Sequence, residues 1–99
     1  MEVNEVTLTG ELTAVDPLRY TPAGVPLSAF RLLHRSVQVE GGVKRQVECE
    51  LAGIALAGAA LGMSGLAAGQ TVTVRGFLNR KNRMSAQLVL HATSMERKG

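Results

Sequence analysis

The sequence predicts an all-β fold in which five strands close into a small barrel. Apolar and polar residues alternate over residues 4–12, with the period of two that marks a half-buried strand. All three prolines lie between positions 17 and 26, and a Gly-Gly pair follows Glu40, so both places favour turns over strands. An alanine- and glycine-rich segment then separates three predicted strands from two further ones.

The first predicted strand covers residues 3–15. Its apolar face is formed by Val6, Leu8 and Leu12. Gly10 stands where this strand must bend to begin a strongly curved hairpin. Residues 16–26 form the first loop, because a proline cannot donate the hydrogen bond that the interior of a sheet requires.

The second and third predicted strands cover residues 27–39 and 43–54, joined by a hairpin turn at residues 40–42. The side chains of the second strand that we expect inside the barrel are Phe30 and Leu32. In the third strand the alternation puts Cys49 on the apolar face, beside Val47 and Leu51. We therefore expect Cys49 to be a small core residue.

Residues 55–69 lack a helical stripe of apolar side chains, and each glycine inside a helix costs about 1 kcal/mol. We expect a short, irregular helix or a loop that plugs one end of the barrel. Residues 70–79 form the fourth strand, with a bulge at Gly76, and residues 85–95 form the fifth. The inward side chains expected in the fourth strand are Val72, Val74 and Leu78.

This order of elements is typical of the OB fold, a five-stranded barrel in which an extra element separates the third and fourth strands. An open five-stranded sheet and an SH3-like barrel are compatible with the same pattern. A chain of 99 residues is long enough for one hydrophobic core, so we expect a single domain over residues 1–99.

The charge balance is mildly basic, with 11 lysines and arginines against eight acids. Six of these cations and one acid lie from Arg75 onward, which favours a polyanionic partner. The single cysteine excludes an internal disulfide, and the acidic N-terminus does not resemble a signal peptide, so we expect a cytoplasmic protein. Residues 51–68 are uncharged, but their glycines argue against a membrane span.

Cations on several segments form a candidate site for nucleic acid. Arg31 and Arg35 point outward from the second strand, and Lys44 lies beside the Gly-Gly turn. The loop between the fourth and fifth strands carries three cations in four positions, which repel one another unless an anion binds. The complete candidate set is Arg19, Arg31, Arg35, Lys44, Arg75, Phe77, Arg80, Lys81 and Arg83.

These residue types suit a single strand, because arginine both pairs with phosphate and stacks on bases. For each cation the alternative is a solvated surface residue. Phe77 is either a stacking ring, if Gly76 does not shift the register, or a core residue. Tyr20 either clamps a strand together with Arg19 or packs on the prolines of the first loop. Rings are scarce, since the chain has one tyrosine, two phenylalanines and no tryptophan.

Catalytic chemistry has little support in the sequence. His34, Cys49 and His91 do not have the spacing of a metal site, and the glycines of residues 58–69 lack the Gly-Lys-Ser/Thr end of a phosphate-binding loop. We therefore expect no enzyme activity, no metal and no cofactor.

Several motifs resemble the bacterial single-stranded DNA-binding protein family. They are the pattern N-x-V-x-L-x-G-x-L at residues 4–12, Asp16-Pro17, the segment 18–22, Gly24 and Phe30. Residues 30–38, 45–49, 76–78 and 88–92 are similar to the primosomal branch of that family. The resemblance implies a homodimer of OB folds that binds single-stranded DNA in replication restart, beside the PriA helicase and with DnaT as a further partner.

One departure from the family lowers the expected affinity. Relatives carry a tryptophan on the third strand where this chain has Glu48, and losing a stacked ring forfeits about 1–3 kcal/mol. Glu48 and Glu50 also repel phosphate, so we expect weak to moderate binding, carried mainly by electrostatics. Two alternatives stay open: a general accessory single-strand binder, and a protein–protein adaptor of the primosome whose DNA binding is weak and residual.

Overall fold

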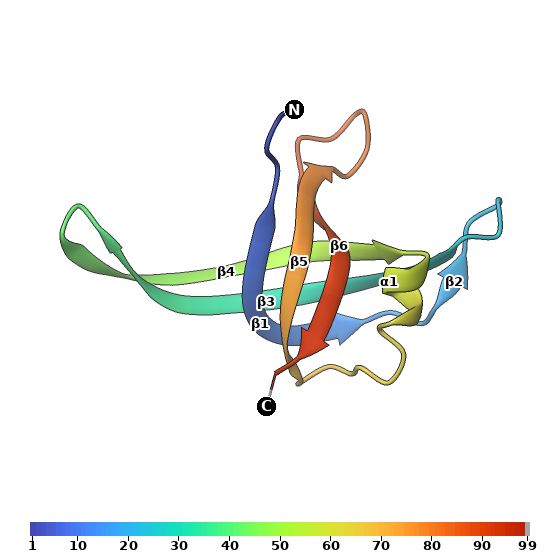
Figure 1. Cartoon of the computed structure of the whole chain (residues 1–99), viewed down its shortest axis with the longest axis horizontal. Helices are drawn as coiled ribbons and strands as arrows, with labels where there is room; N and C mark the ends of the chain where they lie inside the picture. Colours follow the sequence, from blue (N-terminus) through green and yellow to red (C-terminus); the bar gives the residue numbers. More distant parts are fainter. Residues whose placement is uncertain (99) are drawn as a thin grey trace.

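The computed structural model describes residues 1–98, which form a closed barrel of five long strands (Figure 1). The elements are β1 (Val6–Val15), β2 (Arg19–Tyr20), β3 (Pro26–Glu40), β4 (Val43–Leu56), α1 (Gly58–Leu61), β5 (Thr71–Arg80) and β6 (Leu88–Arg97). The strand order β1-β5-β6-β4-β3 closes because β1 also pairs with β3. This is the predicted OB layout, and the alternatives of an open sheet and an SH3-like barrel are excluded.

Closure of the barrel depends on a change of partner along β1. Its first half pairs with β5, and from Glu11 onward it pairs with β3. Gly10 lies at this change, where an added Cβ would come within 2.5 Å of the backbone oxygen of Leu33. Thr13 is an extra residue in the β1–β3 ladder, and such a bulge sharpens the bend. Gly10 therefore permits a close approach of β1 to β3 near the predicted bend, and the bulge follows three residues later.

The core fills the barrel and is sealed at one end by the alanine- and glycine-rich segment. The fully buried side chains are Leu12, Leu32, Val72, Val74 and Leu90. Phe30 packs against Gly53, where an added Cβ would collide with its ring. Ala60 of α1 and Met63 join the same core, which confirms the predicted plug. No helix among residues 1–98 is long and apolar enough to cross a membrane.

Beyond the barrel, β3 and β4 continue as a two-stranded arm, residues 34–49, that extends to the left in Figure 1. Gly41 and Gly42 turn the chain at its tip with φ of 57° and 78°, as predicted. No third strand covers the arm within residues 1–98, so most of its side chains are exposed on both faces. The prediction that Cys49 is a core residue is therefore wrong: its register was correct, but the arm has no core.

The predicted strand ends needed smaller corrections. β1 begins at Val6 rather than residue 3, because the side chain of Asn4, not its backbone, exchanges hydrogen bonds with Leu78. β4 continues to Leu56, and β6 begins at Leu88 instead of residue 85. The first loop contains the short strand β2, which pairs with the start of β3.

Candidate nucleic-acid interface

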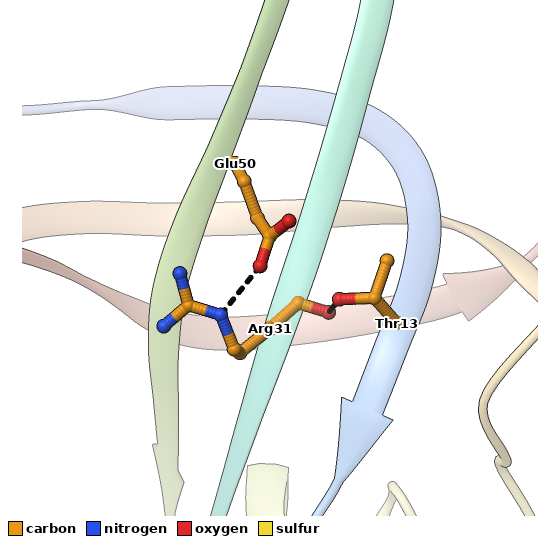
Figure 2. A network of polar contacts seen from close by, with 3 residues as sticks. All are labelled: Thr13, Arg31 and Glu50. Atoms are coloured by element: carbon orange, nitrogen blue, oxygen red, sulfur yellow. Dashed lines mark hydrogen bonds and ion pairs between the residues drawn. The ribbon is translucent and has the colours of Figure 1, made fainter.

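The two candidate arginines of β3 are each paired with a carboxylate of β4. Nε of Arg31 donates a hydrogen bond to Oε1 of Glu50 at 2.5 Å, while its two terminal nitrogens have no marked partner (Figure 2). Nη2 of Arg35 lies 3.6 Å from Oε1 of Glu48, its direct cross-strand neighbour. The outer face formed by these two pairs therefore has no net charge.

The loop between β5 and β6, residues 81–87, presents the opposite situation. Arg80, the last residue of β5, and the loop residues Lys81 and Arg83 have no carboxylate within ion-pair distance anywhere in residues 1–98. The loop backbone is held by a hydrogen bond from the Lys81 amide to the Gln87 oxygen at 2.9 Å. The three cations line a hollow of about 350 Å³, together with Asn79, Asn82 and His91. This cluster retains its full positive charge for an anion.

Arg19 is brought close to this loop by the fold. It lines a hollow of about 300 Å³ on the outer face of the barrel, which Arg31 and Lys81 also border. The other lining residues are Ala29, Ala52, Gly53, Ile54, Gln87, Val89 and His91. Three cations from separate segments thus border one hollow, of which Arg31 is already paired with Glu50. A basic groove of this kind is suited to a single strand.

The remaining candidate cations lie apart from this hollow. Lys44 is exposed at the tip of the arm and has no ion pair among the described residues, whereas its neighbour Arg45 pairs with Glu40 at 3.5 Å. Arg75 projects from β5 and pairs with Glu96 at 3.8 Å. The structure therefore gathers only part of the predicted set.

Phe77 lies on the outer surface, with 38% of its area exposed. Its ring stacks on that of His91, with centroids 5.0 Å apart and an interplanar angle of 11°. The register shift predicted at Gly76 is present, but the extra residue is Thr93 of β6, so β5 keeps its alternation. The core interpretation of Phe77 is therefore wrong, and the ring is available at the surface.

His91 was missed as a candidate by sequence reasoning, although it borders three hollows on the outer face. Only its position opposite Phe77, which depends on the bulge, reveals this role. Tyr20 lies opposite Pro26 in the β2–β3 pair, and 62% of its area is exposed. No three His, Cys, Asp or Glu side chains of residues 1–98 lie together as a metal site would require.

Comparison with known sequences agrees with this geometry. Residues 4–94 match the family described as "Another single-strand binding protein family". The chain is 42% identical over 88 residues to replication restart protein PriB of Nitrosomonas europaea, covering 89% of this chain and 82% of the relative. The chain belongs to the PriB branch of the single-strand binding protein family. The PriB of Proteus mirabilis is 37% identical over 100 residues, covering 97% and 94% of the two chains.

Solved structures extend the same relationship to the fold. The PriB structure from Ralstonia solanacearum superposes with a TM-score of 0.89 at 30% identity, covering 99% of this chain and all of that one. The single-stranded DNA-binding protein of Thermus aquaticus gives a TM-score of 0.78 at 27% identity, covering 98% of this chain and 50% of that one. Membership in a family of non-enzymatic DNA-binding proteins confirms that the chain is not an enzyme.

Proposed function

We propose that the chain is a single-domain protein that binds single-stranded DNA during replication restart. The observation that carries the proposal is the unpaired cluster Arg80, Lys81 and Arg83 beside a hollow that Arg19 also borders. The PriB relatives are named for replication restart, which supports the biological setting. In this role the chain works in the cytoplasm, links single strands to the PriA helicase and has DnaT as a further partner.

The proposed path of the strand follows the charges. Phosphates contact the loop cations and Arg19, and bases lie over the hollow between them. Towards the arm, Arg31 and Arg35 contribute less because Glu50 and Glu48 already neutralise them. Lys44 supplies a further phosphate contact at the arm tip. Affinity is modest, because only two aromatic side chains, Tyr20 and Phe77, have substantial exposure.

A homodimer is part of the proposal, and unpaired strand edges support it. β1 pairs with β3 only from Glu11 onward, so one edge of its first half faces no other strand within residues 1–98. Within the same residues, the two edges of the arm also have no strand partner. Such edges favour pairing with a second copy of the chain. Light scattering should then give twice the 10.5 kDa mass of one chain, and a monomer at working concentrations would contradict the dimer.

The direct test is a titration of a labelled oligonucleotide as a single strand and as a duplex of the same sequence. We expect clear preference for the single strand, because a duplex cannot place its bases in the hollow. Equal affinity for both forms, or no measurable binding at low salt, would contradict the proposed function.

The adaptor alternative is favoured by one observation, the neutralisation of Arg31 and Arg35 by carboxylates. Measuring binding to the helicase and to single strands separately discriminates between the two. An adaptor requires the helicase complex to be much tighter than the DNA complex. A general accessory binder would instead bind single strands and show no affinity for the helicase.

A further inference from the structure

The two histidines of the chain have contrasting surroundings. Both ring nitrogens of His34 are engaged, Nδ1 with the Thr9 oxygen at 2.7 Å and Nε2 with the Ser36 hydroxyl at 2.8 Å. The His91 ring stacks on Phe77, and its nitrogens have no hydrogen-bond partner within residues 1–98. His34 therefore ties the start of the arm to β1, while the nitrogens of His91 are open to a ligand.

His91 occupies the middle of a row of side chains across the outer face. Its register partners are Phe77 on β5 and Ile54 on β4, so the three side chains stand side by side. On one side of the row lies an apolar hollow of about 310 Å³ that Phe77 lines. On the other side lies the hollow of about 300 Å³ that Arg19 and Lys81 border. His91 lines both hollows.

The hollow beside Arg19 and Lys81 has the features of a site for a flat, polar group that is attached to phosphates. Its volume lies at the small end of ligand pockets. His91 and Ile54 give it an aromatic and an apolar wall, and the Gln87 amide at its rim offers both a donor and an acceptor. The two cations carry no ion pair among the described residues, so they can hold phosphates on either side of the group.

We propose that this hollow takes one unpaired nucleobase, which stacks on the imidazole of His91. Phe77 is a positioning residue that supports the His91 ring from its other side, and Gln87 hydrogen-bonds the edge of the base. The inference rests on the proposed single-strand binding and names a base subsite within it. Base stacking on a ring tolerates any sequence, whereas the Gln87 amide adds a preference among bases.

The test compares an ordinary oligonucleotide with an abasic one of equal length, which keeps the phosphates and lacks the bases. His91→Leu should weaken binding of the ordinary strand by about tenfold, since stacking on one ring contributes an effect of this order. It should leave binding of the abasic strand unchanged. His91→Phe keeps a ring and should restore the affinity. This variant tests the role of the ring even if His91→Leu lowers the stability of the fold.

Leu61→Ala is the control, because it shortens an exposed apolar side chain of α1 that does not line this hollow. We expect it to change the ratio of the two affinities much less than His91→Leu does. An equal loss on both oligonucleotides, or no loss on either, would overturn the base subsite while leaving single-strand binding intact. Failure of the unsubstituted protein to bind either strand would instead overturn the proposed function itself.

Discussion

The arginines of β3 and the cations of the β5–β6 loop look alike in the sequence but differ in the folded chain. On β3, Arg31 and Arg35 each meet a glutamate of the neighbouring strand. At the loop, Arg80 at the end of β5 and its neighbours Lys81 and Arg83 meet none within residues 1–98. The difference shows that strand pairing decides how much positive charge remains for a phosphate, because it brings distant acids beside the cations.

The energetic consequence differs for folding and for binding. Exposed ion pairs contribute only about 0–1 kcal/mol to stability, and the Arg35 side chain is 66% exposed. Their effect on DNA binding is larger, because a paired arginine attracts phosphate less and its acid repels it. The β3–β4 face and the loop can therefore be compared by variants that leave the barrel folded.

The largest effect is expected from the loop. Lys81→Ala/Arg83→Ala removes two unpaired cations and should weaken single-strand binding on the order of tenfold or more at low salt. Fluorescence anisotropy measures the affinity, and the thermal midpoint should hardly change because both side chains are exposed. Affinity equal to that of the unsubstituted protein would remove the loop from the interface.

A gain of affinity should follow when the β3 arginines lose their partners. Glu48→Gln/Glu50→Gln removes the acids that pair with Arg35 and Arg31. We expect single-strand binding to strengthen roughly several-fold at low salt, because both arginines can then pair with phosphates. Glu11→Gln/Asp16→Asn changes the net charge equally at acids that have no ion pair among the described residues. If that control binds just as tightly, net charge and not the freed arginines explains the gain.

Lys44 tests whether the place of a cation or its ion pairing decides its effect on DNA binding. Like the loop cations it has no ion pair among the described residues, but it lies on the arm. Lys44→Ala should weaken binding by about two- to threefold, less than the loop variant, as expected for one phosphate contact. The same titration measures it. No change would restrict the DNA path to the barrel.

The smallest effect is expected when a whole pair is removed. Arg35→Ala/Glu48→Ala leaves the net charge unchanged, and we expect the affinity for single strands to stay within about twofold. A tenfold loss in the same assay would mean that Arg35 leaves Glu48 to contact the DNA, and the contrast with the loop would disappear.

Sequence reasoning predicted the barrel well because alternation and turn residues are local features. The Gly-Gly turn, the plug at residues 55–69 and the inward valines of β5 all follow from neighbouring residues. It failed where burial depends on distant elements. Cys49 has the register of a core residue, yet no strand covers the arm at that point in the described chain.

The candidate site was predicted less completely for the same reason. The pairing of Arg35 with Glu48 depends on the register between β3 and β4, and the exposure of Phe77 depends on a bulge in β6. His91 could be recognised as a candidate site residue only from the structure, because the bulge sets its ring against Phe77. The unpaired loop cations were the part that the sequence alone could predict, because no acid on a neighbouring strand of the described chain neutralises their charge.

The salt dependence of single-strand binding tests the central claim most directly. The logarithm of the binding constant should fall steeply with the logarithm of salt concentration, by about 0.7 for each phosphate neutralised. Lys81→Ala/Arg83→Ala should make this slope shallower by about 1.4, whereas Arg35→Ala/Glu48→Ala should leave it unchanged. A flat slope for the unsubstituted protein, or a loss of slope in the Arg35 and Glu48 variant but not in the loop variant, would contradict the account.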